Sequence, residues 1–398
     1  MRITAGSKKT YLNKMGILCA AGGSAEELRI GVSEQSDYFS LSNAFGTEVK
    51  HRLGVCQQAL PKIPLNDAKW QSRNNQLALA ALMQIEADVK LAIEQYGSER
   101  VGIVIGTSTS GIAEGEAAIR AIQQGEAAGN YDYCVQEMGA TADFIAEILN
   151  INGPVYGIST ACSSGAKALT SARRLLRSGI CDVVIAGGVD SLCRLTVQGF
   201  SSLDAVSSER CNPFSKNRNG INIGEGAALF ILSRTPEGVE LCGVGEGSDA
   251  HHISAPDPSG EGAIRSMTEA LEDAELKAAD INYVNLHGTA TALNDQMEAK
   301  AMHKVFGSQT PCSSTKALTG HTLGAAGAVE AGICWLLLNP DNTCSLPAHC
   351  WDGEYDPELP NINLLSVTDA ALITDIKYVI SNSFAFGGNN ISLLLGRV

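Results

Sequence analysis

The sequence predicts an α/β fold, and two alternating patterns carry that prediction. Short apolar runs are typical of strands buried on both faces of a parallel sheet. These runs are Val101–Ile105, Val183–Ala186, Ala227–Leu232 and Tyr283–Leu286. Stretches rich in Ala, Leu and Glu lie between them and favour helices. They include Asn75–Tyr96, Thr141–Leu149, Gly165–Ser178 and Gly262–Ala274. Strands that alternate with helices indicate the α/β class.

The chain has 398 residues, enough for two or three domains or for one duplicated unit. No flexible linker divides it cleanly, and the weakest joint is Ser233–Gly238 (SRTPEG). We therefore expect an N-terminal half, residues 1–232, and a C-terminal half, residues 233–398. Each half contains strands alternating with helices and a reactive residue flanked by glycine, which suggests a distant duplication.

The composition excludes several classes of protein. The 43 acidic and 29 basic residues give a net charge of −14, which argues against a nucleic-acid-binding protein. No apolar run reaches the roughly 18 residues of a membrane span, and the N-terminus lacks the apolar segment of a secretory signal. Twelve cysteines are scattered without a C-x-x-C pair. We expect reduced thiols in a cytoplasmic protein with no metal site.

A candidate nucleophile stands in Gly157–Gly165, which reads GISTACSSG. Cys162 lies between a strand-like run and a helix, so its thiol faces the positive end of the helix dipole, which favours the thiolate. Small neighbours leave space for a substrate carbonyl, and backbone N–H groups can hold an oxyanion there. A packed structural cysteine is the alternative.

Two further segments carry titratable residues. His287 follows an apolar strand in LHGTATALNDQME, although a hydrogen-bonded core histidine would give the same local pattern. Lys316, His321 and Glu330 stand in SSTKALTGHTLGAAGAVE, a segment otherwise free of charge. A cysteine with two histidines and a lysine suits acyl transfer with stabilisation of an enolate.

Ser381–Asn390 reads SNSFAFGGNN. Phenylalanines between small residues can form a mobile apolar gate, and an ordinary strand end is the alternative. Together with Asn212–Gly226 (NPFSKNRNGINIGEG), these segments resemble the elongating β-ketoacyl-acyl-carrier-protein synthases with a Cys-His-His triad. The resemblance runs from about Val101 onward and implies a thiolase-like fold, with two duplicated halves in a five-layer α/β/α/β/α arrangement, usually dimeric.

The resemblance also implies roles for the reactive residues. Cys162 would take the acyl group, and His287 and His321 would polarise the malonyl thioester for decarboxylation. Lys316 would set the electrostatics of the site, with Glu330 as its partner or as a structural anchor.

Other residues would bind and orient the substrate. The backbone amides of Cys162 and Phe386 would form the oxyanion hole, and Phe386 would gate the acyl pocket. Thr289, Thr291 and Ser254 would contact the pantetheine arm. The remaining implied residues are Thr109 and Phe200 in the acyl pocket and Asp295 in a supporting position.

Two of the chain's departures from the family bear on the carrier protein and on the acyl pocket. Asp204 lies in GFSSLDA, where the family commonly has a basic residue that meets the carrier protein. Thr107–Ser110 (TSTS) occupies the region of the pocket floor. An unpaired Thr109 hydroxyl there would disfavour long saturated chains, unless these hydroxyls bond within their own turn.

The expected function is decarboxylative condensation of an acyl thioester with malonyl-acyl carrier protein, in fatty-acid, polyketide or polyene synthesis. The carrier's phosphopantetheine would deliver the substrates, with no redox or metal cofactor. A homodimer is expected, and a heterodimer with a related chain is possible. The alternative is a chain-length factor, but such partners usually replace the cysteine. A thiolase would need a second cysteine near GGNN, and an initiating ketosynthase lacks the Lys-x4-His pair.

Overall fold

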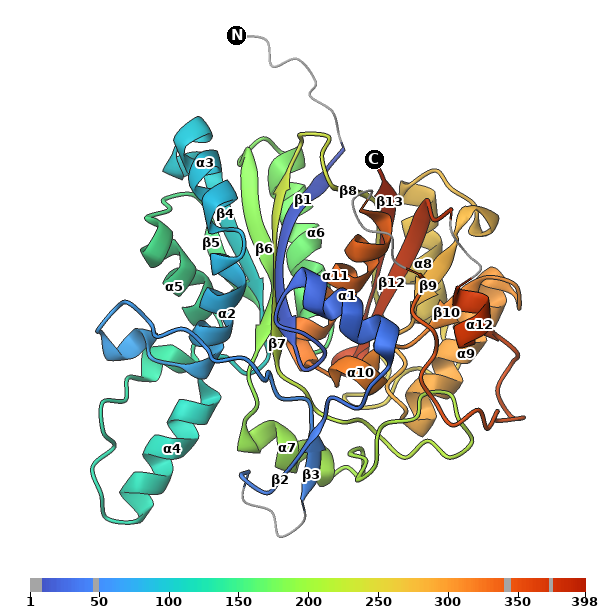
Figure 1. The fold of residues 1–398 in the computed structure, drawn as a ribbon, viewed down its shortest axis with the longest axis horizontal. Coiled ribbons are helices and arrows are strands. Elements are labelled where there is room, and N and C mark those ends of the chain that lie inside the picture. Colours follow the sequence, from blue (N-terminus) through green and yellow to red (C-terminus); the bar gives the residue numbers. More distant parts are fainter. Residues whose placement is uncertain (1–8, 46–49, 340–344, 372–374) are drawn as a thin grey trace.

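The computed structural model describes residues 9–45, 50–339, 345–371 and 375–398. We expected no secretory signal at the N-terminus, and residues 1–8 of that segment lie outside the described residues. Across the described residues the elements form layers: outer helices, strands, central helices, strands and outer helices again (Figure 1). This is the thiolase-like α/β/α/β/α arrangement that the resemblance implied.

The strands of the first half stand in the order β5-β4-β6-β7-β1. β4 is parallel to β5 and β6, whereas β7 is antiparallel to both β6 and β1. Their bounds are β1 (Tyr11–Cys19), β4 (Val101–Gly106), β5 (Val155–Ile158), β6 (Val183–Asp190) and β7 (Gly226–Ser233). The three strands predicted in this half are confirmed.

The second half repeats this plan in the order β10-β9-β12-β13-β8, with the same polarity at each pairing. Its strands are β8 (Val239–Ser248), β9 (Tyr283–Asn285), β10 (Pro311–Ser313), β12 (Tyr378–Ala385) and β13 (Asn389–Arg397), with β11 (Asn363–Leu364) added beside β10. The halves join where Tyr11 and Leu12 pair with Glu240 and Val239. The repeated strand order indicates a duplication, and a domain boundary at residue 232 remains our proposal.

The central layer consists of α6 (Ser164–Arg177) and α11 (Ala326–Leu338). Every residue of α11 is buried, because this helix packs against strands of both halves. A helix that is apolar on all sides is stable only inside a protein, so the core runs continuously between the two groups of strands.

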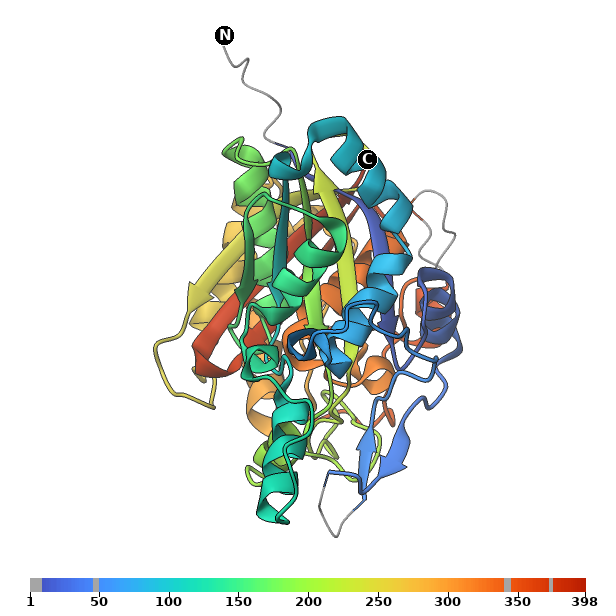
Figure 2. The same ribbon diagram turned by 90° about the vertical axis from the view of Figure 1, so that its left-hand side faces the viewer.

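The outer face of the first half is covered by α2 (Arg73–Met83), α3 (Glu86–Tyr96) and α5 (Ala140–Leu149) (Figure 2). The predicted single helix Asn75–Tyr96 is therefore wrong: it breaks at Gln84. The Gln84 side chain accepts the Ile17 N–H at 3.1 Å and donates to the Ile17 carbonyl at 3.0 Å, which ties the break to β1.

The second half is covered by α8 (Glu261–Asp273) and α9 (Ala292–Phe306). The other elements are α1 (Ala25–Glu34), β2 (Ser40–Ser42), β3 (His51–Leu53), α4 (Ile112–Gln123), α7 (Arg194–Ser201), α10 (Lys316–Thr319) and α12 (Val367–Ala370). Single 3₁₀ turns occur at Ala68–Trp70, Ser98–Arg100, Tyr133–Gln136, Ala278–Asp280, Leu323–Ala325 and Phe386–Gly388. None of the helices in the described ranges is long and apolar enough to cross a bilayer. The eleven cysteines in those ranges are free thiols.

Candidate active site

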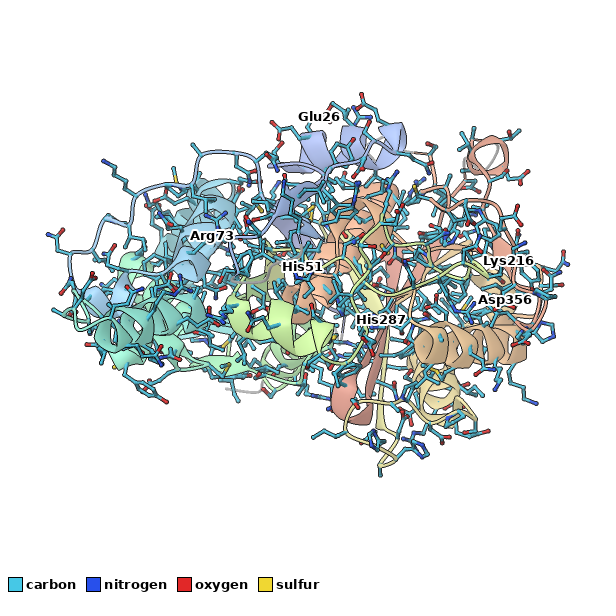
Figure 3. All side chains as sticks on the ribbon, turned by 90° about the horizontal axis from the view of Figure 1, so that it is seen from below. Glu26, His51, Arg73, Lys216, His287 and Asp356 are labelled. Atoms are coloured by element: carbon cyan, nitrogen blue, oxygen red, sulfur yellow. The ribbon has the colours of Figure 1, made fainter. Side chains whose placement is uncertain are left out.

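The predicted reactive residues follow the carboxyl ends of parallel strands in both halves. Cys162 follows β5, His287 follows β9, His321 follows β10 after the short helix α10, and Phe386 follows β12. Seen from below (Figure 3), His287 lies near the middle of the molecule, between the two halves. The duplication therefore brings residues from distant parts of the sequence to one place.

A tight turn between β5 and α6 presents Cys162. Ala161 has φ +54°, a left-handed conformation that is strained for a residue with a Cβ. The Ser164 hydroxyl donates to the Ala161 carbonyl at 2.6 Å and accepts the Thr160 N–H at 2.8 Å, which holds the turn in place. The structure therefore gives Cys162 the position of a nucleophile at a strand-to-helix elbow.

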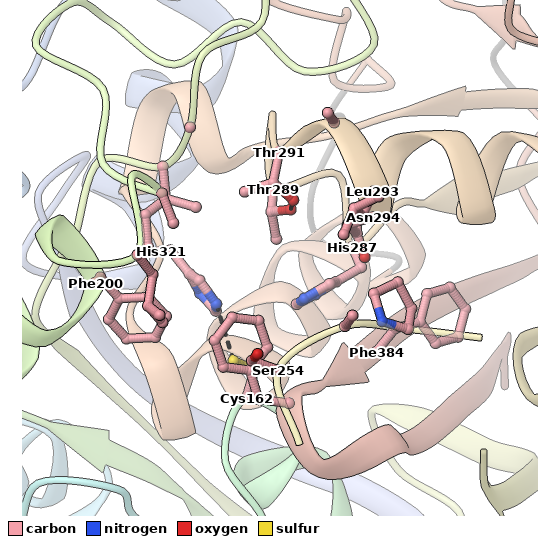
Figure 4. A pocket seen from close by; sticks show the side chains of 18 of the residues that line it. Cys162, Phe200, Ser254, His287, Thr289, Thr291, Leu293, Asn294, His321 and Phe384 are labelled. Carbon is pink, nitrogen blue, oxygen red and sulfur yellow. Dashed lines mark hydrogen bonds between the residues drawn. The ribbon is translucent and has the colours of Figure 1, made fainter. Parts of the chain in front are cut away.

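Cys162 is 5% exposed. Burial raises the pKa of this thiol to about 12, while the nearby Lys316 charge and the Phe386 N–H oppose the rise. Desolvation therefore outweighs the predicted effect of the helix N-terminus, and Cys162 rests as a thiol. His321 Nε2 lies 3.0 Å from the sulfur (Figure 4), within reach of its proton.

The two histidine rings stand edge to face, with centroids 5.4 Å apart and an interplanar angle of 83°. Burial lowers the pKa of both His287 and His321 well below 6.5, and the Lys316 charge lowers it further. Both imidazoles are therefore neutral at neutral pH. The Cys162 sulfur and one nitrogen of each ring all lie within 4.8 Å of one another, facing a shared space (Figure 4).

Lys316 is almost fully buried and contacts both His287 and Glu330. Its Nζ donates to the Glu330 carboxylate and to the His287 carbonyl, and lies 3.3 Å from His287 Nδ1. Burial raises the pKa of Glu330 to about 7, opposed by the Lys316 charge. Lys316 contacts His287 but is not among the described residues that line the cavity below.

A second buried carboxylate, Glu298 on α9, supports His287. Glu298 accepts the backbone N–H groups of His287 and Gly288, both at 2.7 Å. Sequence reasoning missed Glu298 and named Asp295, which accepts the Phe214 N–H at 2.7 Å. The Asn294 side chain donates to both carboxylates and so links Asp295 to Glu298. The supporting role of Asp295 stays a prediction, and it would act through Glu298. Both acids stand on α9 directly after the His287 turn, a spacing that could have suggested either one.

The reactive group opens into a cavity of about 530 Å³. Thr289, Thr291 and Ser254 line it, and the two threonine hydroxyls lie 2.9 Å apart. Phe200 and Phe386 also line it, with ring centroids 5.5 Å apart. The structure thus brings the residues predicted for the pantetheine arm and for the gate to the space above Cys162.

Thr109 does not belong to the described lining of this cavity. Its hydroxyl donates to Asp190 at 2.9 Å, and the Thr107 hydroxyl donates to the same carboxylate at 2.7 Å. Asp190 also accepts backbone N–H groups of Ser108 and Gly324. The expectation of an unpaired Thr109 hydroxyl in the acyl pocket is therefore wrong, and these hydroxyls give no guide to chain length. Sequence reasoning missed Asp190, which pairs them.

We expect Thr109→Val to lower stability without changing the products. The substitution removes a hydrogen bond to a buried carboxylate, a loss of about 1–3 kcal/mol in the free energy of unfolding. Denaturant unfolding and a product profile from mixed acyl substrates measure the two effects, with Thr109→Ser as the control that keeps the hydroxyl. Unchanged stability with longer products would return Thr109 to the acyl pocket.

The fold is thiolase-like, with the same strand order in both halves, and it holds a buried thiol beside two neutral imidazoles. These features define a condensing enzyme that transfers acyl groups through a cysteine. The family model described as "Beta-ketoacyl synthase, N-terminal domain" matches residues 25–237, and the corresponding "C-terminal domain" model matches residues 239–344. The chain belongs to the β-ketoacyl synthase family and is an acyltransferase.

Individual relatives agree with this assignment. The 3-oxoacyl-[acyl-carrier-protein] synthase 2 of Staphylococcus aureus (strain COL) is 30% identical over 354 residues, 84% of each chain. A chain in the complex of a ketosynthase with its chain length factor from Xenorhabdus doucetiae is 43% identical, with a TM-score of 0.93 and 98% of both chains covered. A β-ketoacyl synthase from Burkholderia phymatum STM815 is 27% identical, with a TM-score of 0.86, and the match covers 98% of this chain and 100% of that one.

Proposed function

We propose that this chain condenses an acyl group, held as a thioester on Cys162, with a malonyl group on an acyl carrier protein. Carbon dioxide is lost, and a 3-oxoacyl thioester is formed. The observation that supports this most directly is the buried Cys162 sulfur 3.0 Å from His321 Nε2, with a second neutral imidazole facing the same cavity.

In the first step Cys162 attacks the acyl thioester. His321 Nε2 takes the thiol proton as the S–C bond forms, which offsets the high pKa of the buried thiol. The Phe386 N–H already points at the sulfur, and together with the Cys162 N–H it would hold the oxyanion. Collapse of the tetrahedral intermediate releases the carrier thiol and leaves acyl-Cys162.

In the second step a malonyl thioester occupies the cavity. A neutral imidazole can donate one N–H to its carbonyl oxygen. His287 would do so as negative charge develops there, and so would His321 once its proton stands on Nε2, the nitrogen that was the base in the first step. Loss of carbon dioxide gives the enolate, whose carbon attacks the acyl-Cys162 carbonyl. The carbon–carbon bond forms, the thiolate of Cys162 leaves, and it takes up one proton from solvent, which the loss of carbon dioxide from a carboxylate requires.

Lys316 and Glu298 act through His287 in this proposal. Lys316 contacts the His287 carbonyl and lies near Nδ1, and Glu298 accepts its backbone N–H. These contacts set the ring's direction before a substrate arrives, and such pre-organisation is a large part of electrostatic catalysis.

The substrates would arrive on the phosphopantetheine of the carrier. Thr289, Thr291 and Ser254 offer hydroxyl groups along the cavity to the amides of such an arm. No redox or metal group has a step in this chemistry, and a cytoplasmic location remains a prediction.

A chain-length factor is the second candidate, favoured by the relative solved as a complex of a ketosynthase with such a factor. The present chain combines Cys162, His287, Lys316 and His321 in one group, so we propose that it is the catalytic member of any such pair. The same relative supports a heterodimer as the assembly, with a homodimer as the alternative.

Intact-mass spectrometry tests the proposal. Incubation with acyl carrier thioesters of graded chain length is expected to add one acyl group, which peptide mapping assigns to Cys162. Release of carbon dioxide from malonyl carrier protein, with a 3-oxoacyl product, should follow. Acyl loading without carbon dioxide release would point to a different acyl transfer.

A further inference from the structure

The lining of the active-site cavity carries an excess of negative charge. Asp204 and Asp249 provide carboxylates, and Arg218 provides the only guanidinium or ammonium group among the described residues of the lining. Arg218 is already paired with Asp356, which lies outside the lining. The positive charge of Arg218 is therefore balanced, and the two carboxylates of the lining are left in excess.

The two carboxylates differ in their surroundings. Asp249 accepts hydrogen bonds from the Asn390 side chain and from the Asp257 N–H, so its oxygens are engaged within the protein. Asp204 is exposed, and within the described ranges no ion pair or hydrogen bond to its carboxylate is found. It is thus a charged group at the cavity with no partner in the described part of its own chain.

The backbone holds Asp204 at the rim. It follows α7 in a left-handed conformation with φ +53°, and its N–H donates to the Ser201 carbonyl at 3.1 Å. Asparagine and aspartate tolerate this conformation better than most residues. Leu203 beside it and Leu293 at the start of α9 also line the cavity, and each is 55% exposed. The rim thus presents a carboxylate flanked by aliphatic side chains.

Two basic side chains that follow Asp204 in the sequence are engaged within the protein. Lys216 pairs with Glu354, and the guanidinium of Arg210 donates to the carbonyls of Ala317, Gln35 and Ser36. A phosphopantetheine arm carries an anionic phosphodiester, and charge repulsion disfavours this group near an unpaired carboxylate at the cavity. A cationic group on the docked partner would offset this repulsion.

We propose that Asp204 is a docking contact that selects a carrier protein with a basic side chain beside its phosphopantetheine-bearing serine. The exposed leucines receive apolar side chains of the same carrier surface. This inference rests on the proposed function, because it takes a carrier protein as the source of the substrate. In this proposal the carrier must present a positive charge at this contact. Complementary charges across an interface increase its specificity and its association rate.

The test compares two malonyl-loaded carriers that differ only next to the modified serine, where one has lysine and the other glutamate. Binding is measured by calorimetry at low and high salt, and turnover by the 3-oxoacyl product that each carrier gives with protein already acylated on Cys162. The wild-type protein is expected to bind the lysine carrier about two- to fivefold more tightly, a difference that shrinks with salt. Asp204→Asn should remove the preference, and Asp204→Arg should invert it.

Two controls separate docking from chemistry. Glu126→Gln removes an exposed negative charge that does not belong to the cavity lining, and it should keep the wild-type preference. Malonyl pantetheine without a carrier should be turned over equally by every variant, which verifies the fold and the proposed function independently. If the wild-type protein prefers the glutamate carrier, or if Asp204→Arg leaves the preference unchanged, the docking role is wrong. If neither malonyl carrier gives a 3-oxoacyl product while the lysine carrier still binds best, the proposed function fails and the docking contact stands.

Discussion

Replacing Cys162 with alanine is expected to abolish both acyl loading and condensation. The sulfur forms the covalent intermediate, and no other thiol belongs to the described lining of the cavity. Removing a covalent nucleophile commonly lowers turnover by about 10³- to 10⁶-fold. Intact-mass spectrometry after incubation with acyl carrier thioesters measures loading, and product analysis measures condensation.

The controls separate this effect from a general loss of thiol reactivity. Cys134 is an exposed cysteine outside the cavity lining, so Cys134→Ser should load and condense at the wild-type rate. Cys162→Gln places an amide where the acyl thioester would stand, and we expect it to keep releasing carbon dioxide from malonyl carrier protein. An acyl adduct that forms normally in Cys162→Ala, at another residue, would overturn the assignment of the nucleophile.

Sequence patterns predicted much of the fold, because buried strands and amphipathic helices leave local signatures. β4, β6, β7 and β9 begin within one residue of their predicted starts. The break between α2 and α3 left no such signature. It is tied to a contact between Gln84 and the backbone of Ile17, residues that are adjacent only after β1 has joined the sheet.

The reactive residues could also be predicted, since each stands beside glycine or small residues at the end of a strand. The sequence could not show how close these residues lie to one another or how burial changes their pKa values. The distance from Cys162 to His321, and the burial that raises the pKa of the thiol to about 12, depend on the packing of both halves. The polar turn around Thr109 was misread for the same reason: Asp190, which pairs with it, comes from a different strand.

The two histidines are expected to separate acyl loading from decarboxylation. His287→Ala and His321→Ala should both lower carbon dioxide release from malonyl carrier protein by about 10²- to 10⁴-fold, because each removes a donor that acts on the enolate-like state. Both variants should still accept an acyl group on Cys162. Labelled malonyl carrier protein measures the gas released, and intact-mass spectrometry follows the acyl adduct.

The geometry further predicts that the two variants differ in loading. His321 Nε2 lies 3.0 Å from the sulfur, whereas the Nδ1 of His287 faces Lys316. The buried thiol has a raised pKa and needs a proton acceptor, so loading should fall more in His321→Ala than in His287→Ala. His303→Ala, on the exposed side of α9, should leave both steps unchanged. Wild-type carbon dioxide release in both active-site variants would remove the enolate role, and equal loading rates would assign activation of the thiol to the helix N-terminus instead of His321.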